Sequence, residues 1–455
     1  MMARINSHQS IGGITPMKTA VKRTGAFLLL SLLIVLQLTA ASVSRAKPED
    51  VGMSSERLQR IDQMLERRIA KGEITGAVAI VARKGKVVHL TAKGVMDLET
   101  KQAVTPATMF RVASMTKPVT SVALMMMVEE GKVRLNDPVS RYIPEFRNLK
   151  VAVAAPEPAV AAGERGVAPA PGAGGQGRGG RGGAPLNFTT VAAQREVTVK
   201  DLLTHVSGLA SGAMSSSTVS APAVSRKQGE KLADYIPRLG STALEFQPGS
   251  RWAYSAQAGH DTLGRIVEIA SGMPLNEFFQ KRIFDPLGMK DISFWPSEAQ
   301  WARVASVYGG GANGLTKNNN PNGMSSNVYF MGSGGLISTA EDYIPFGVML
   351  ANGGELNGKR ILSRKTVEMF RSAHVPDTLP GRAAGEGYGL GVRVVTSHVK
   401  RGTMLSDGTF GWSGVYGTHF FVDPVEQLVG VLLVQTSIQE VNRDFEDMVA
   451  QSIID

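Results

Sequence analysis

The chain has 455 residues, of which 43% are hydrophobic, so it can bury a large core and favours two lobes. It contains no cysteine, which excludes disulfides, a thiol nucleophile and a thiolate metal site. The net charge is +10, but residues 1–46 contribute half of it and no basic helix follows, so we expect no nucleic-acid partner.

The N-terminus has the order of a secretory signal peptide. Basic residues precede an apolar run over 26–38, and small residues follow it up to Ala46. The run is short for a transmembrane helix. We therefore predict a signal peptide over 1–46, whether translation starts at Met1 or at Met17, and a periplasmic or secreted protein without a stable membrane span after cleavage. An uncleaved membrane anchor is the alternative.

The next predicted elements are a helix and a hairpin. Helical periodicity runs from Ser54 to Arg68, with the first serine as N-cap. Two strand-like runs, 76–82 and 87–90, follow with a short basic turn between them. These elements come directly before the first chemical motif.

That motif is Ser114-Met-Thr-Lys117, at the start of an apolar stretch with helical spacing. Residues three apart on a helix share a face, so the Lys117 amine is expected beside the Ser114 hydroxyl. A serine hydroxyl needs a base to become a nucleophile, and a buried lysine near the positive end of a helix dipole is favoured in the neutral form that accepts a proton. Ser-x-x-Lys also arises by chance in chains of this size, so the motif needs partners elsewhere.

Between 151 and 194, alanine, proline and glycine dominate and almost no large apolar residue is present. Such a segment supplies no core, so we predict a disordered insertion that acts as a spacer. Its arginine-glycine pairs resemble RNA-binding tails, but one short tract is weak support for that interpretation.

Ordered sequence returns near 197, where His205 is expected to pack at the end of a short helix. A longer helix is predicted over 258–270, with Tyr254 in the loop before it. The stretch 309–332 is rich in glycine and asparagine, which predicts a surface loop.

Three strand-like runs, 388–395, 417–423 and 428–435, precede a closing helix over 440–453. Tight turns between strands favour antiparallel pairing. The N-terminal hairpin would complete the sheet.

Together these elements predict an α/β (α+β) fold, in which helices flank an antiparallel sheet and a second lobe is mostly helical. We assign 51–135 and 330–455 to the sheet lobe. The helical lobe takes 136–329 and includes the insertion.

Acyl transfer by a serine needs a base, a proton route to the leaving group and two donors for the oxyanion. Tyr254, in a loop at a helix entrance, is the candidate proton relay. The segment 411–415, Gly-Trp-Ser-Gly-Val, enters a strand and has the small residues that let a backbone N–H approach Ser114.

In this order the motifs resemble those of the serine β-lactamase and penicillin-binding protein superfamily, near class C β-lactamases and family VIII carboxylesterases. The resemblance covers most of 51–437 outside the insertion. It rests on Ser114-Met-Thr-Lys117-Pro, Leu202-Leu-Thr-His-Val-Ser-Gly-Leu, Tyr254-Ser, Gly332-Ser-Gly-Gly-Leu-Ile-Ser-Thr-Ala-Glu-Asp, and Gly411-Trp-Ser-Gly with Val422-Asp-Pro. It implies a β-lactamase/transpeptidase-like fold, a small-molecule ester or β-lactam-like substrate, and no cofactor.

The resemblance also implies roles for single residues. Ser114 would be the acylated nucleophile, Lys117 its base, and Tyr254 the tyrosine of the second motif.

Trp412, Ser413 and Gly414 occupy the position of the third motif. Val415 stands where the family takes its second oxyanion N–H, and the first would be the N–H of Ser114 itself.

Two departures from the family pattern bear on the substrate. The second motif often reads Tyr-x-Asn, but position 256 is alanine, and the third often opens with lysine or histidine, but here with Trp412. A tryptophan supplies an apolar wall and one N–H but no charge, so β-lactams and peptides that carry a carboxylate lose a contact. Trp-x-Gly here is typical of family VIII esterases. We therefore favour a carboxylesterase on small neutral esters, with or without weak β-lactamase activity.

Two other functions stay open: a D-amino-acid peptidase, amidase or penicillin-binding enzyme on cell-wall peptides, and a relative that binds such ligands without catalysis. The missing third-motif cation weighs against the first, and the intact serine, lysine and tyrosine weigh against the second.

A Ser-His-Asp hydrolase is disfavoured because no complete Gly-x-Ser-x-Gly occurs. The seven histidines lack metal-binding spacing, so no metal is expected. Acyl chain length, natural substrate and oligomeric state stay open.

Overall fold

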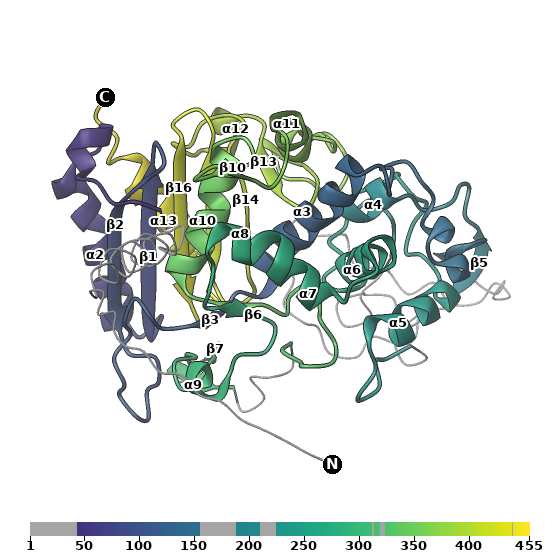
Figure 1. Ribbon diagram of the computed structural model, residues 1–455, viewed down its shortest axis with the longest axis horizontal. Helices are drawn as coiled ribbons and strands as arrows, with labels where there is room; N and C mark the ends of the chain where they lie inside the picture. The colour runs from purple at the N-terminus through teal and green to yellow at the C-terminus, as the bar shows by residue number, and fades with distance from the viewer. Residues whose placement is uncertain (1–42, 155–187, 210–223, 312–313, 319–323, 439) are drawn as a thin grey trace, which may run out of the picture. The chain divides into compact units, whose positions relative to one another are not determined.

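The computed structural model describes residues 43–154, 188–209, 224–311, 314–318, 324–438 and 440–455 (Figure 1). All of them fall in one unit, Val43–Asp455. Residues 1–42 of the predicted signal peptide, with its apolar run, lie outside the described residues, as does most of the predicted insertion. The last four residues of the predicted signal peptide, 43–46, are described, and the Ala46 N–H donates to the Val87 carbonyl at 3.0 Å. No helix within the described ranges is long and apolar enough to cross a bilayer.

The main sheet has seven antiparallel strands (Figure 1). Their order across the sheet is β12 (Glu386–Tyr388), β13 (Arg393–Val395), β14 (Phe410–Ser413), β15 (His419–Asp423), β16 (Leu428–Val434), β1 (Gly76–Arg83) and β2 (Lys86–Gly94). Because β1 pairs with both β2 and β16, residues from opposite ends of the chain lie side by side. The predicted antiparallel sheet, completed by the N-terminal hairpin, is confirmed.

Helices cover both faces of this sheet (Figure 1): α2 (Ser55–Ala70) and α13 (Glu440–Ala450) pack on one face, and α10 (Ala340–Ala351) packs on the other. Alternate side chains of a strand point to opposite faces. In β1, residues 77, 79 and 81 therefore pack with α2 and α13, whereas residues 78 and 80 belong to the larger core that contains α10. Strand β1 is buried along its whole length for this reason.

Helix α2 forms where the sequence predicted it. The side chain of Ser54 accepts a hydrogen bond from the Arg57 N–H, as an N-cap does. Leu58, Ile61 and Leu65 recur at helical spacing and are buried against the sheet.

Two further helices position the site: α3 (Thr116–Glu129) and α6 (Ala258–Ser271), which pack against each other. The other helical segments are η2 (Pro48–Val51), η3 (Ala113–Met115), η4 (Val139–Arg141), η5 (Pro144–Phe146), α4 (Val199–Leu203), α5 (Leu232–Tyr235), η6 (Ile236–Ser241), α7 (Leu275–Phe279), η7 (Gln280–Phe284), α8 (Asp285–Leu287), α9 (Glu298–Trp301), α11 (Arg364–Arg371) and α12 (His398–Arg401). The other strands are β3 (Phe110–Arg111), β4 (Lys150–Ala154), β5 (Phe188–Ala192), β6 (Ile292–Ser293), β7 (Tyr308–Gly311), β8 (Gly314–Lys317), β9 (Ile337–Ser338), β10 (Glu355–Leu356) and β11 (Lys359–Arg360). The division of the chain into a sheet lobe and a helical lobe stays a prediction.

The ends of the predicted disordered insertion are ordered. Strands β4 and β5 pair as an antiparallel hairpin, with Val151 buried and β5 exposed. The sequence did not predict them because alanine-rich segments carry little strand propensity, whereas the pairing depends on backbone hydrogen bonds. The remainder, 155–187, lies outside the described residues.

Two predictions about the C-terminal strands are wrong. The run 388–395 is divided between β12 and β13, because the chain turns at Gly391, where φ is 87°. A Cβ at this glycine would lie 2.0 Å from Ser121 Oγ of α3, so the close approach requires glycine. The segment 411–415 does not lead into a strand at 417: residues 411–413 belong to β14, which ends at Ser413, and the next strand, β15, begins at His419.

The predicted surface loop 309–332 also contains more structure than expected. Strands β7 and β8 form a hairpin within it. Tyr329 is buried near its end, and its hydroxyl donates a hydrogen bond to Asp261 at 2.8 Å. Glycine and asparagine content predicts turns but does not show which side chains a loop buries.

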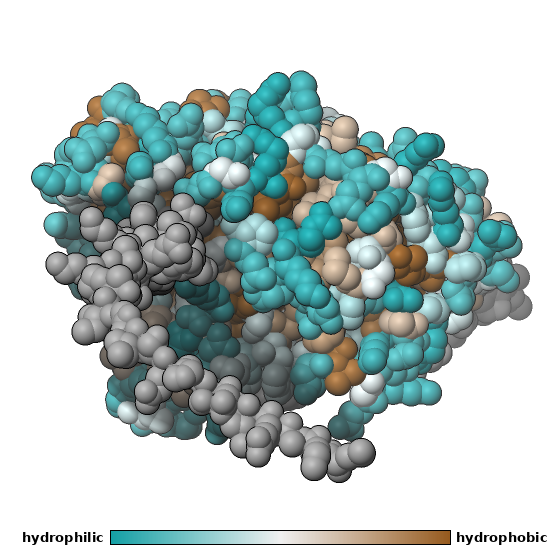
Figure 2. Space-filling model, viewed as in Figure 1, coloured by the Kyte–Doolittle hydropathy of each residue, from teal (hydrophilic) through white to brown (hydrophobic). Residues whose placement is uncertain are grey.

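On the face shown in Figure 2, hydrophilic residues predominate and hydrophobic residues form small separate groups. The most exposed large apolar side chains of the described residues, Val399 and Val425, are isolated positions of the kind found on most monomers.

Candidate active site

Ser114 lies in η3, a short turn between β3 and α3. The sequence predicted it at the start of the α-helix, which instead begins two residues later. Ala113, directly before it, has a φ of 47°, a strained value for a residue with a Cβ. The chain thus turns sharply at this point, and the serine side chain lines a cavity.

Contacts from three other segments hold this turn. The Val112 N–H donates to the Leu336 carbonyl at 3.1 Å, and the Thr418 hydroxyl donates to the Val112 carbonyl at 3.1 Å. The buried Tyr343 hydroxyl donates to the Met115 carbonyl at 2.8 Å. The position of the serine is therefore set by the tertiary structure and not by its helix alone.

Two polar side chains meet the Ser114 hydroxyl. Tyr254 donates a hydrogen bond to Ser114 Oγ at 2.8 Å, although it is 140 residues away in sequence. Lys117 Nζ lies 3.1 Å from the same oxygen and 5.0 Å from the centre of the Tyr254 ring. The structure thus brings together the three residues that the sequence proposed as nucleophile, base and proton relay.

Lys117 is fully buried, and two backbone carbonyls fix its amine. Nζ donates to the carbonyls of Ala256 and Ser333, each at 2.7 Å. Two of the hydrogens on Nζ are therefore directed to these carbonyls. The remaining direction around the nitrogen, which holds a hydrogen or a lone pair, faces Ser114. Ala256, whose side chain departs from the family motif, therefore contributes through its backbone.

The Ser333 carbonyl is positioned in turn by Asp261 of α6. The Ser333 N–H donates to the carboxylate of this residue at 2.9 Å. Burial raises the pKa of Asp261 above its usual range, against the hydrogen bonds from Tyr329 and Ser333. Neither Asp261 nor Ser333 was assigned a role from the sequence, because the contact of the Ser333 carbonyl with the amine, and that of Asp261 with Ser333, depend on tertiary packing.

Two buried histidines lie behind Tyr254. The His205 ring is 4.8 Å from the Tyr254 ring and 5.2 Å from the His260 ring, centre to centre. Burial lowers the pKa of both histidines well below 6.5. Both imidazoles are therefore neutral at pH 7, and His205 packs near the end of a short helix, as the sequence predicted.

Aromatic side chains form one wall of the cavity. The Trp412 ring lies 5.4 Å from the Tyr254 ring and 5.3 Å from the Tyr388 ring, and Trp252 stacks 6.4 Å from Tyr254. These contacts fix the orientation of the Tyr254 ring. Trp412 provides the apolar wall that the sequence predicted at the third-motif position.

The segment after β14 passes very close to the serine turn. A Cβ on Gly414 would lie 2.5 Å from the Val112 carbonyl oxygen and 2.2 Å from Thr418 Oγ1, so only glycine fits. The next residue, Val415, is half exposed at the rim of the cavity. Its N–H has no acceptor among the described residues, so it is available to a substrate oxygen.

We expect Gly414→Ala to lower kcat/KM for ester hydrolysis about a hundredfold. The added methyl group must push the 412–415 segment away from the serine turn, and a displacement of about 1 Å at a reacting centre has this order of effect. Steady-state kinetics would measure it. Gly309→Ala is the matched control, because a Cβ there meets nothing within 4 Å. Equal activity of the two variants would show that the close approach is unimportant.

The cavity has a volume of about 660 Å³. Its lining includes all the residues predicted for the site except the buried Lys117, and others that the sequence did not indicate, namely Trp252, Gln257, Met324, Gly381, Arg382, Ala383, Glu386 and Arg393. The two arginines matter most, because the sequence suggested a cavity without a cation.

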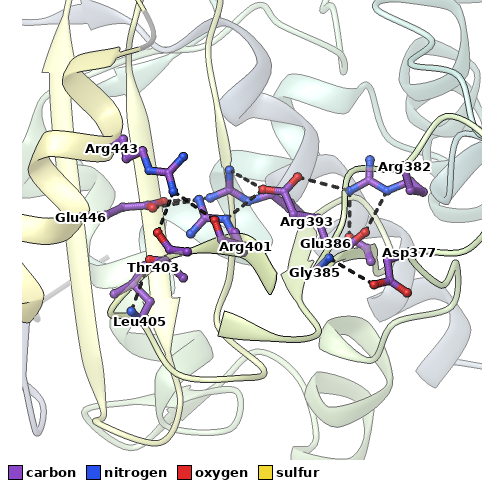
Figure 3. Close-up of polar contacts among 12 residues, drawn as sticks. Asp377, Arg382, Gly385, Glu386, Arg393, Arg401, Thr403, Leu405, Arg443 and Glu446 are labelled. Carbon is purple, nitrogen blue, oxygen red and sulfur yellow. Dashed lines mark hydrogen bonds and ion pairs between the residues drawn. The ribbon is translucent and has the colours of Figure 1, made fainter. Parts of the chain in front are cut away.

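These arginines belong to a series of ion pairs with alternating charge (Figure 3), formed by Arg382, Glu386, Arg393, Glu446 and Arg401. Arg393 donates to Glu446 at 2.8 Å and also lies 3.7 Å from Glu386. Arg382 donates to two backbone carbonyls and stacks 4.3 Å from the centre of the Trp252 ring. Both cations at the cavity wall are therefore already engaged.

Among the described residues, no cluster of histidine, aspartate and glutamate is arranged to hold a metal ion. The chemistry that the cavity offers is that of the serine, the amine and the phenol.

Comparisons with known proteins identify the family to which the chain belongs. A family model described as Beta-lactamase matches residues 61–453. Esterase EstB of Burkholderia gladioli is 29% identical over 404 residues, which cover 84% of this chain and 91% of that protein. A putative D-alanyl-D-alanine carboxypeptidase of Escherichia coli (strain K12) is 27% identical over 451 residues, covering 91% of this chain and 90% of the relative.

Among solved structures, EstCE1, described as a hydrolase with promiscuous acyltransferase activity, has a TM-score of 0.68 and 24% identity, covering 88% of this chain and 99% of that one. This likeness shows the fold, and it confirms the predicted fold class of an antiparallel sheet with helices. The family match spans the serine turn, the sheet and the segment after β14. The chain therefore belongs to the Beta-lactamase family, within the serine β-lactamase and penicillin-binding protein superfamily, and is a serine hydrolase.

Proposed function

We propose that the protein is a carboxylesterase that forms an acyl-enzyme on Ser114 and acts on small neutral esters. The observation that carries the proposal is the pair of contacts on Ser114 Oγ, from Tyr254 at 2.8 Å and Lys117 at 3.1 Å. They lie in a cavity whose third-motif position holds an uncharged tryptophan. The relative named as an esterase supports the same reaction class.

In the acylation step, Ser114 Oγ attacks the ester carbonyl while its proton passes to the neutral amine of Lys117. The two carbonyls that take the hydrogens of this amine leave its lone pair directed at Oγ. Tyr254 gives its phenolic proton to the departing alkoxide and regains one from Lys117. The acyl C–O bond to the alcohol breaks, and the alcohol leaves neutral.

Deacylation reverses these roles. Water attacks the acyl-enzyme carbonyl, its proton passes to the Lys117 and Tyr254 pair, and Ser114 regains a proton as the acid leaves. The backbone N–H groups of Ser114 and Val415 would bind the oxyanion in both steps, where each such donor contributes about 3 kcal/mol.

A peptidase or penicillin-binding activity on cell-wall peptides is the second candidate. Arg382 and Arg393 at the cavity wall favour it, as does the relative named as a putative D-alanyl-D-alanine carboxypeptidase. Against it, both guanidinium groups are engaged by glutamates, backbone carbonyls or an aromatic ring. A substrate carboxylate would therefore have to compete for them.

An activity panel on the mature protein tests the choice. We expect kcat/KM for p-nitrophenyl acetate and butyrate to exceed that for a chromogenic cephalosporin or a D-Ala-D-Ala peptide by about a hundredfold. The reason is that the carboxylate of the cephalosporin or the peptide would find no free cation in the cavity. A hydrogen bond to a charged group contributes about 1.5–3 kcal/mol to binding. Higher activity on the peptide would reject the esterase in favour of the peptidase, and a weak signal with the cephalosporin would indicate residual β-lactamase activity.

The same proposal includes a periplasmic or secreted location and a small-molecule ester or β-lactam-like substrate. Cell fractionation with antibody detection tests the location, and retention in the membrane fraction would point to the uncleaved anchor.

A further inference from the structure

Ser413, at the end of β14, is the first member of a hydrogen-bonded series that runs away from the cavity. It lines the cavity, and its Oγ lies 2.9 Å from Nδ1 of His419, its partner across the β14–β15 ladder. His419 Nε2 lies 3.0 Å from a carboxylate oxygen of Glu446 on α13. His419 and Glu446 are both almost completely buried.

Glu446 is held as a carboxylate. Arg393 and Arg401 each donate to it, at 2.8 and 2.9 Å (Figure 3). Burial opposes ionisation, but Arg393, His419 and Arg401 outweigh it and hold the pKa of this carboxyl well below its usual range. An ionised carboxylate only accepts hydrogen bonds, so the hydrogen between Glu446 and His419 must be on Nε2 of the histidine.

This placement fixes the other ring nitrogen. Burial lowers the pKa of His419 below its ordinary value, against the effect of Glu446, so the ring is neutral at pH 7 and carries one hydrogen. With that hydrogen on Nε2, Nδ1 has a free lone pair. The 2.9 Å contact is therefore a hydrogen bond donated by Ser413 and accepted by His419.

We infer that Ser413 acts in the cavity as a hydrogen-bond acceptor, and that it selects esters that carry a donor, a hydroxyl or an amide N–H, near the reacting carbonyl. Its only hydrogen is used on His419, so the cavity side of Oγ presents lone pairs. Ser413 would be the specificity residue, and His419 and Glu446 position it. The selection of esters rests on the proposed esterase function, but the orientation of the hydroxyl does not.

The same arrangement disfavours a substrate carboxylate at this place. A carboxylate and the lone pairs of Oγ would face each other without a hydrogen between them, unless the bond to His419 broke. Arg393, which could otherwise attract such a group, already donates to Glu446. The series thus gives a second physical reason for a preference for neutral substrates. From the sequence alone, this preference was attributed to Trp412.

Matched esters test the selection. We expect kcat/KM for p-nitrophenyl 3-hydroxybutyrate to exceed that for p-nitrophenyl butyrate about tenfold, the effect of one neutral hydrogen bond. Ser413→Ala should bring this ratio close to one, whereas Ser413→Thr, which keeps the hydroxyl, should retain most of it. The ratio is informative whatever the variants do to overall activity, because both substrates meet the same enzyme. An unchanged ratio in Ser413→Ala would overturn the selection.

A measurement that needs no turnover tests the orientation. The ¹⁵N signals of labelled histidine in the full protein distinguish the Nε2–H from the Nδ1–H tautomer, and His419 can be assigned from the signals lost in His419→Gln. We expect the Nε2–H tautomer at pH 7, and Nδ1–H would overturn the acceptor role. If no ester were hydrolysed but the Nε2–H tautomer were found, the esterase function would fail and the acceptor role of Ser413 would stand.

Discussion

Ser114→Ala is expected to lower kcat/KM for p-nitrophenyl acetate at least about a thousandfold, because it removes the hydroxyl that we propose as the nucleophile, which Lys117 and Tyr254 contact. Removing the nucleophile of a serine hydrolase leaves only the contribution of binding and of the oxyanion donors. The Ser114 side chain lines an open cavity, so its loss should change the free energy of unfolding by no more than about 0.5 kcal/mol.

Two measurements make this result decisive. A fluorophosphonate probe followed by intact-mass analysis should add one label to the wild-type protein and none to Ser114→Ala. Ser241→Ala, a substitution at an exposed serine, should keep both the label and the activity. Activity above a few per cent in Ser114→Ala would refute the assignment of the nucleophile.

Lys117→Ala should be nearly as damaging, with a loss of about 10²–10⁴-fold in kcat/KM, the usual contribution of a positioned general base. This variant also removes a fully buried side chain and leaves the carbonyls of Ala256 and Ser333 without a donor. We therefore expect it to be destabilised by about 2–5 kcal/mol, measured by urea denaturation.

Lys117→Gln separates the base from the scaffold. A glutamine amide can donate to both carbonyls, but it cannot accept the serine proton as an amine does. We expect a folded protein with the same loss of activity as the alanine variant. Lys71→Ala, at an exposed lysine at the end of α2, is the control for replacing a lysine away from the cavity and should keep the activity. A folded Lys117→Gln enzyme that retained a tenth of the activity would move the role of base to Tyr254.

The choice of ester over peptide depends on charges that only the structure shows. The third motif carries no charge in the sequence, because Trp412 stands at the position where a cation was expected from the resemblance. The structure adds Arg382 and Arg393 to the same cavity, and then pairs them with glutamates and backbone oxygens. Ion pairing within the wall leaves the cavity without a free guanidinium among the described residues that line it. This pairing and the uncharged Trp412 both favour the neutral esters that we propose as substrates.

The sequence predicted the elements whose signals are local. Helix α2 followed from apolar spacing and a serine cap, β1 and β2 from two apolar runs around a basic turn, and α6 from periodicity that ends at Gly272. The boundaries failed where tertiary contacts override local preference. The turn at Gly391 divides the strand-like run 388–395 because the chain must pass against α3.

What the sequence determined by itself was which residue types stand at which spacing. The three-residue spacing between Ser114 and Lys117 predicted that the amine would lie beside the hydroxyl. The order of the motifs indicated Tyr254 and the segment 412–415. The partners of the buried polar groups were decided only by the tertiary structure, which directs the carbonyls of Ala256 and Ser333 to the amine and directs the Ser413 hydroxyl to His419. The physical reason is that a buried donor or acceptor must form its hydrogen bond with whatever group the packing of distant segments brings within about 3 Å. Local sequence patterns do not predict which group that is.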